Sequence, residues 1–208
     1  MKKKKMVWYI LFGMNVCLAV LLGAQYTKRW QIQQSIAEKV LRFHVIANSD
    51  SAKDQALKLK VRDAVGKEMA EVFADVGSRE ACEAIAAEKL DEIECIARRV
   101  IAAEGYDYEA CAFVKEVDFP AKTYGNYIFP AGEYEALEVV IGEGAGQNWW
   151  CVMYPNMCFS GSVYEVVDEE AGEALKEVLS EEEYAEVFSE GEYEVRFQYL
   201  TFLNELTK

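Results

Sequence analysis

Apolar residues recur with two periods along the chain, one typical of helices and one typical of strands. Helical spacing predicts helices over residues 51–73, 78–105, 169–179 and 180–188. Alternation at every second residue predicts strands over residues 40–47, 108–119, 134–141, 149–154 and 193–199. This order of elements, with three strands in succession, favours an α+β fold in which a mainly antiparallel sheet packs against helices.

Local signals mark where some of these elements begin and turn. Ser51 with Asp54, and Ser180 with Glu183, have the spacing of capping boxes and predict helix starts. The glycine-rich connection 142–146 is five residues long and suits a hairpin with positive φ angles. No Lys-Ser/Thr pair follows these glycines, so we interpret the connection as a tight turn and not as a phosphate-binding loop.

The first residues differ from everything that follows. Lys2–Lys5 are positive, and residues 6–24 are nineteen residues without a charge. As a helix they would span roughly 28 Å, close to the hydrocarbon thickness of a bilayer. The lysines are expected to hold this end in the cytoplasm, so that the rest of the chain is translocated. We therefore predict one N-terminal transmembrane helix that precedes an extracytoplasmic domain.

The predicted organisation has three parts: a signal or transmembrane segment at 1–24, a helical stalk at 25–38 and an α+β signalling domain at 39–208. Leu22-Gly23-Ala24 is a poor small-x-small cleavage site, which favours an uncleaved anchor over a signal peptide. Both alternatives stay open. The protein is accordingly expected in the cell membrane with a single span, or secreted into the intermembrane space after cleavage.

The charge of the chain excludes some classes of partner. Outside Lys2–Lys5 it has 18 basic and 36 acidic residues. This acidic balance argues against binding to nucleic acid or to an anionic membrane surface. His44 is the single histidine, and no usual metal-ligand spacing accompanies it, so no metal or cofactor is expected. Cys151 and Cys158 flank a predicted turn and form a candidate disulfide, since disulfides persist outside the cytoplasm.

Three blocks of sequence resemble a known family. They are residues 42–65, which include Ala47-Asn48-Ser49-Asp50-Ser51, residues 124–137, which begin Tyr124-Gly125-Asn126-Tyr127, and residues 141–152, which end Trp149-Trp150-Cys151-Val152. In these blocks the chain resembles the family of stage II sporulation protein R. The resemblance covers nearly all the chain after the predicted span.

The resemblance implies a signalling role. Proteins of this family are made in the forespore and exported into the space between the two septal membranes. There they activate a membrane-embedded aspartic-type protease, which cleaves the precursor of sigma factor E (pro-sigma-E) in the mother cell. This chain would then be no enzyme itself, and its partner would be that protease.

The residues predict a partner-binding surface at one end of the sheet. A polar cluster lies where a strand meets a helix, and two cations four residues apart follow on that helix. Adjacent tryptophans would add aromatic anchors, although one of the two is expected in the core, because neighbouring strand residues face opposite ways. The candidate residues are Arg42, Asn48, Asp50, Asp54, Lys58, Arg62, Trp149 and Trp150.

Two other classes of function compete with signalling. An extracytoplasmic hydrolase acting on the cell wall would use His44, Asp50 and Cys151, and it would turn over substrate alone. A structural septal protein would leave processing of the sigma factor unchanged.

Overall fold

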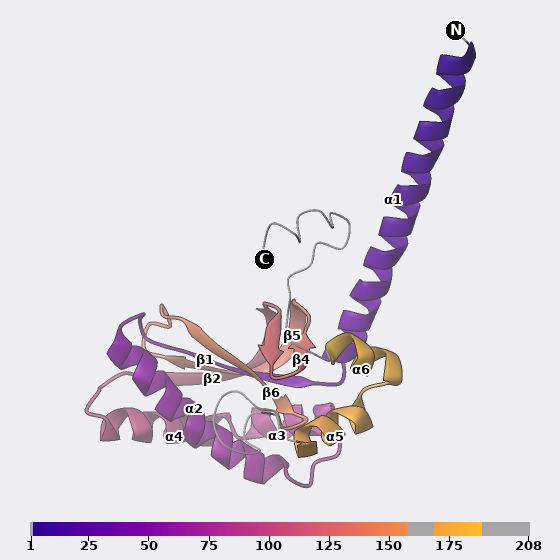
Figure 1. Cartoon of the computed structure of the whole chain (residues 1–208). Coiled ribbons are helices and arrows are strands. Elements are labelled where there is room, and N and C mark those ends of the chain that lie inside the picture. The colour runs from indigo at the N-terminus through magenta and orange to yellow at the C-terminus, as the bar shows by residue number, and fades with distance from the viewer. Residues whose placement is uncertain (1, 158–168, 189–208) are drawn as a thin grey trace.

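The computed structural model describes residues 2–157 and 169–188, and it has the predicted α+β architecture (Figure 1). Its helices are α1 (Lys2–Ala37), α2 (Ala52–Phe73), α3 (Arg79–Glu88), α4 (Leu90–Ala103), α5 (Glu169–Val178) and α6 (Glu181–Val187). Its strands are β1 (Leu41–Ile46), β2 (Ala110–Phe119), β3 (Lys122–Tyr124), β4 (Tyr127–Phe129), β5 (Gly132–Ile141) and β6 (Asn148–Tyr154). The strand predicted at 193–199 lies outside the described residues.

The main sheet is mixed, with the strand order β2-β5-β1-β6. β2 and β5 are antiparallel, β1 and β6 are antiparallel, and β1 runs parallel to β5. The predicted hairpin at 142–146 is therefore wrong, because β1 lies between the two strands that this connection joins. Two of its three glycines do take the expected conformation, with φ 58° at Gly142 and 60° at Gly144.

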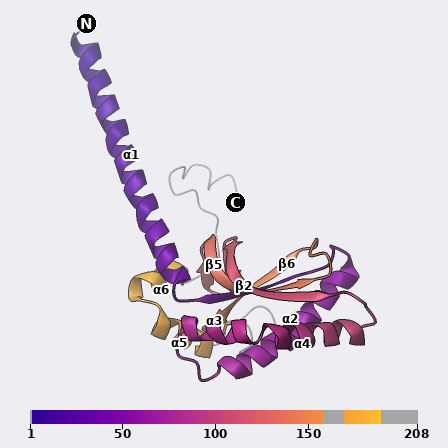
Figure 2. The ribbon, with the colours of Figure 1, turned by 180° about the vertical axis from the view of Figure 1, so that it is seen from behind.

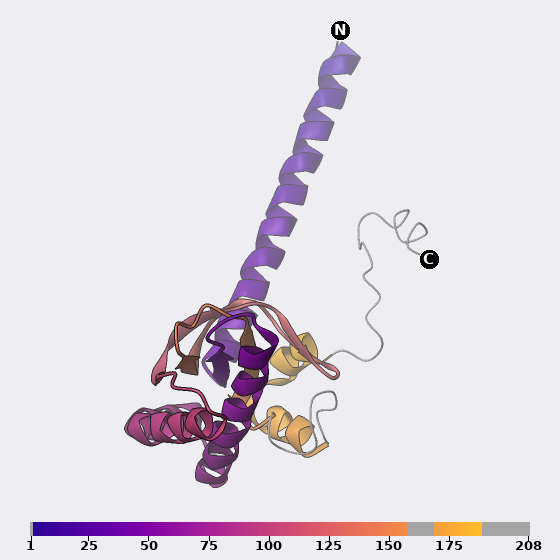
Figure 3. The same cartoon turned by 90° about the vertical axis from the view of Figure 1, so that its left-hand side faces the viewer.

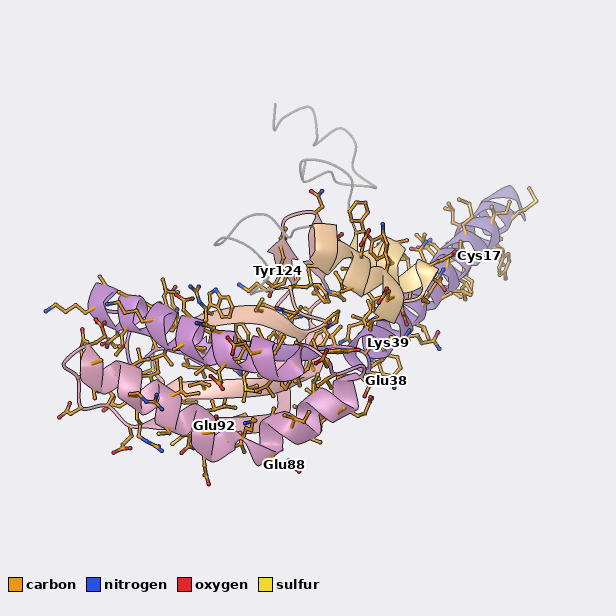
Figure 4. The ribbon with its side chains drawn as sticks, turned by 90° about the horizontal axis from the view of Figure 1, so that it is seen from below. Cys17, Glu38, Lys39, Glu88, Glu92 and Tyr124 are labelled. Carbon is orange, nitrogen blue, oxygen red and sulfur yellow. The ribbon has the colours of Figure 1, made fainter. Side chains whose placement is uncertain are left out.

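Two further features differ from the sequence prediction. Residues 122–129 form a small hairpin of β3 and β4, which turns at Gly125 with φ 55°. The helix predicted over 78–105 is broken at Lys89, whose φ and ψ are −99° and 9°. Figure 4 shows Glu88 and Glu92 on the two sides of this break.

One face of the sheet is covered by α2, α3 and α4, which lie together on the same side in all views (Figures 1, 2 and 3). Alternate residues of the strands point into this layer, as the period of two requires. The resulting core includes Leu41, Phe43, Val45, Leu57, Val61, Met69, Ile93, Ile101, Leu137 and Val139. This face of the sheet is thus fully used for folding.

A second core forms at one end of the sheet, chiefly on the opposite face, and it extends around to the side of α2–α4, where α5 lies (Figures 1 and 2). The end of α1, the β3–β4 hairpin, α5 and α6 supply most of it, and its members include Ile36, Val40, Phe129, Tyr134, Leu175 and Val187. Glu183 of α6 forms an ion pair with Lys39 at 2.6 Å and accepts a hydrogen bond from Ser35. Figure 4 shows Lys39 at the end of α1, beside α6.

α1 is a continuous helix that projects from the sheet on the side opposite α2–α4 (Figures 1 and 3). Its stretch Trp8–Ala37 is the one described helix long and apolar enough to cross a membrane. A signal sequence near the N-terminus has the same properties. The last turns of α1 differ from its exposed apolar part, because Gln33 and Ile36 are buried against the domain. The predicted stalk is therefore part of the fold at its far end.

Candidate functional site

The polar segment between β1 and α2 is held together by Asp54. Its carboxylate accepts hydrogen bonds from Ser49 Oγ at 2.5 Å and from Asn48 Nδ2 at 3.0 Å. These two donors lower the pKa of Asp54 below its ordinary value, because they stabilise the charged form. Ser51 caps α2 by accepting a hydrogen bond from the Asp54 backbone N–H, as predicted.

The same segment binds the connection between β5 and β6. Asn48 Oδ1 accepts from the Glu143 backbone N–H at 3.0 Å, and Asp50 Oδ1 accepts from the Gln147 N–H at 2.8 Å. Lys58 completes the link by donating to the Gln147 carbonyl at 2.9 Å. The predicted residues Asn48, Asp50, Asp54 and Lys58 are thus brought together. Asn48, Asp50 and Lys58 hold the two loops against each other, and Asp54 orders the loop between β1 and α2.

Arg62 and Trp149 extend this group along the edge of the sheet. The Arg62 guanidinium lies 4.7 Å from the Trp149 ring centroid, a cation–π distance. Trp149 also meets Phe43 edge to face, with ring centroids 5.8 Å apart. Lys58 and Arg62 are only 5% and 4% exposed, so neither presents a free charge to a partner in this conformation.

Arg42 does not join this group. It lies at the opposite end of β1, fully buried on the other face of the sheet. Its guanidinium is surrounded by aromatic rings, and its Nε donates to the Cys151 carbonyl at 2.9 Å. The rings and their distances to the guanidinium carbon are Phe119 at 4.3 Å, Tyr134 at 4.9 Å, Phe129 at 5.2 Å and Tyr124 at 5.9 Å. Burial lowers its pKa from the ordinary value. These contacts make Arg42 a core residue.

The other face of the sheet also carries a charged cluster that sequence reasoning missed. One carboxylate oxygen of Glu138 forms an ion pair with Lys115 Nζ at 2.5 Å, and the other oxygen lies 2.9 Å from His44 Nε2. Trp150 stacks on the His44 ring, with centroids 4.9 Å apart. Burial lowers the pKa of His44 to about 4 in spite of Glu138, so the imidazole is neutral at pH 7. The alternation of apolar residues predicts that His44 and Trp150 each lie on a strand. Only the register between β1 and β5 brings Glu138 next to His44.

The residues of the hydrolase alternative are not assembled. Cys151 is disulfide-bonded and therefore is not a thiolate nucleophile. His44 contacts Glu138, whereas Asp50 is bonded to the Gln147 backbone. The predicted disulfide partner, Cys158, lies outside the described residues. Across residues 2–157 and 169–188, no group of three His, Cys, Asp or Glu side chains is placed to hold a metal ion.

Comparison with known proteins gives a family match over most of the domain. Residues 37–164 match the profile of the family described as Stage II sporulation protein R. A relative from Bacillus subtilis (strain 168), named Stage II sporulation protein R, is 38% identical over 171 residues, which cover 82% of this chain and 72% of the relative. No solved structure matches significantly.

Proposed function

The chain belongs to the stage II sporulation protein R family and so has a role in sporulation, and we propose that it acts there as an exported signal and not as an enzyme. In this proposal its domain engages a membrane-embedded aspartic-type protease outside the cytoplasm. The engaged protease then cleaves pro-sigma-E in the mother cell.

The observation that carries the proposal is the extent of the family match. Residues 37–164 contain every strand of the main sheet and all three helices packed on it. The apolar helix α1 supports delivery across a membrane, either as a signal sequence or as a single anchor. In this proposal residues 1–24 deliver the protein to the membrane, residues 25–38 form the stalk, and residues 39–208 form the signalling domain.

Binding energy would supply the activation. A ligand that binds the active form of the protease better than the resting form shifts the population toward the active form. Moving that equilibrium from about 1:99 to 99:1 takes roughly 5.5 kcal/mol of differential affinity. Protein–protein contacts of ordinary size provide energies of this order, so no chemical step in this chain is required.

Co-expression in a non-sporulating host tests the proposal. The host carries the protease and pro-sigma-E, with and without the full chain, and precursor cleavage is followed by gel mobility. We expect cleavage only when the chain is present and exported. The matched control is a variant that lacks residues 1–24 and stays in the cytoplasm, which should not trigger cleavage.

Absence of cleavage with the full chain exported and the protease intact would contradict the signalling role. Cleavage triggered equally by the cytoplasmic variant would show that activation does not require export, which would contradict the proposed extracytoplasmic engagement.

A further inference from the structure

On the sheet face opposite α2–α4, exposure increases along every strand in the same direction. On β1, Arg42 is 0% and His44 1% exposed, and Ile46 is half-buried. On β5, Tyr134 and Ala136 are buried and Val140 is half-buried. The second core therefore covers only the end of this face near α1, and the end near the loops is left open.

The open end carries an apolar patch, which we call the open face. It consists of Ile46, Cys111, Phe113, Lys115, Val140 and Trp150. Phe113 is 43% exposed, and among the described residues it is the one large exposed apolar side chain outside α1. These apolar side chains adjoin one another, since Val140 is paired with both Ile46 and Cys111. A contiguous accessible apolar patch, unlike a single exposed residue, is typical of an interaction surface.

The charge of the open face differs from that of the whole chain. The chain has a formal net charge of −14, yet Lys115 is the one charged member of the patch, with its side chain 49% exposed. The carboxylate that pairs with it, Glu138, is buried beneath the surface at 5% exposure. The open face thus offers an apolar surface with one accessible cation, which complements an apolar segment that carries a carboxylate.

The position of the open face suits an incoming segment. It lies on the side of the sheet from which α1 projects (Figures 1 and 3). Residues 25–37 of α1 are helical, and at 1.5 Å per residue they hold the sheet roughly 20 Å from the predicted membrane segment. A helix with its side chains is about 10 Å wide, so one further layer fits on this face.

The family match favours a partner over the chain's own C-terminal residues as the occupant. All six residues of the open face fall within residues 37–164, whereas residues 189–208 fall outside that match. If the open face serves the role common to the family, its occupant has to be present for every member of the family. The proposed protease meets this condition.

We propose that the open face is the surface on which the protease docks, through an apolar segment that places a carboxylate opposite Lys115. This inference rests on the proposed function and specifies its contact surface. It differs from the loop-end group of Asn48, Asp50 and Lys58 in accessibility, because the hydrogen-bonded Lys58 is only 5% exposed, whereas the side chain of the paired Lys115 is 49% exposed.

Two native cysteines provide the test. Cys111 belongs to the open face, and Cys95 lies on α4 on the opposite side of the sheet; both are free and exposed. Membranes that contain the full chain, with and without the protease, are treated with a membrane-impermeant maleimide, and the labelled cysteines are identified by mass spectrometry. The protease is expected to slow labelling of Cys111 about tenfold or more and to leave Cys95 unchanged.

A pair of variants tests whether this contact activates the protease. Phe113→Glu places a charge on the open face at an exposed position, and Ala84→Glu places the same side chain at an exposed position of α3, away from the open face. In the co-expression assay Phe113→Glu should lower precursor cleavage about tenfold, as expected for a central interface residue, and Ala84→Glu should leave it unchanged.

The outcomes separate this inference from the proposed function. Normal cleavage with Phe113→Glu, or unchanged Cys111 labelling beside an active protease, would overturn the docking surface and leave the signalling role standing. No cleavage with the unmodified chain would remove the signalling role itself. If Cys111 is protected without the protease and becomes reactive when residues 189–208 are deleted, the occupant is the chain's own C-terminal segment, and the inference is wrong.

Discussion

At the scale of single residues, polar side chains are held by two kinds of contact, those made within one helical turn and those made between strands. Ser51 and Ser180 cap their helices as predicted, because each serine oxygen accepts from a backbone N–H only three residues further along the chain. His44 meets Glu138 only through the pairing of β1 with β5. Arg42 is surrounded by aromatic rings because of the register of several strands. No spacing along the chain predicts these contacts.

Gly142 allows a residue-scale test of how tightly the two loops are joined. Its φ is +58°, and an added Cβ would lie 2.2 Å from Asn48 Oδ1. Gly142→Ala therefore adds a clash to the strain of a left-handed conformation and should lower the free energy of unfolding by about 2–3 kcal/mol. Thermal unfolding of the purified full chain in detergent would measure it.

Gly105 is the matched control for this substitution. Its φ is +82°, but nothing lies within 4 Å of the added Cβ. Gly105→Ala should cost only the backbone strain, about 1 kcal/mol. Equal losses for the two variants would mean that Asn48 moves freely and that the loop-end contacts do not constrain Gly142.

At the scale of elements, the hydrophobic pattern gives the face of each strand but not its neighbour. The alternation over 134–141 and 149–154 predicted both strands, and the short glycine-rich connection suggested that they pair. In the structure β1 lies between them, because the connection crosses the end of β1 through hydrogen bonds to Ala47 and Asn48. The hydrophobic pattern also does not predict the helix break at Lys89. The buried Ala86 and Ile93 are seven residues apart, a spacing that fits an unbroken helix.

The junction of α1 with α6 makes an element-scale prediction about pH. Burial raises the pKa of Glu183, but hydrogen bonds from Lys39, Ser35 and the Ser180 backbone outweigh it and lower the value to about 2. Because the folded-state pKa lies below the ordinary 4.5, the stabilisation is present above about pH 4.5 and is lost as the pH falls toward 2. Glu183→Gln should therefore destabilise the protein by about 1–3 kcal/mol at pH 7 and progressively less in acid.

Glu182 is the neighbouring control. It pairs with Lys28 at 2.7 Å, but both side chains are more than 60% exposed, so solvent and salt screen the pair. Glu182→Gln should change stability little at any pH. Denaturant unfolding of both variants and of the unmodified chain between pH 3 and 7 would measure these differences in stability. If the loss caused by Glu183→Gln does not shrink in acid, the ionised Glu183 carboxylate is not the source of the stabilisation.

At the scale of the whole molecule, the two cores have different relations to the membrane helix. The first core uses only residues after the stalk, whereas the second includes Ile36 at 0% exposure, with Gln33 packed close to Gly132. The last turns of α1 are thus shared between delivery and folding. Removal of the apolar segment at a site near Ala24 would leave these turns in place, so an anchored and a released form would have the same domain.

Two truncations test this division at the level of the folded molecule. A form that begins at residue 25 keeps Gln33 and Ile36, and its free energy of unfolding should match that of the full chain within about 0.5 kcal/mol. A form that begins at residue 38 loses a fully buried isoleucine and exposes the second core, which should cost about 2–4 kcal/mol. Both would be produced with a cleavable export signal and compared by thermal unfolding. If the two forms are equally stable, the end of α1 is not part of the domain, and the predicted boundary at residue 39 describes the folding unit better than the packing of Ile36 does.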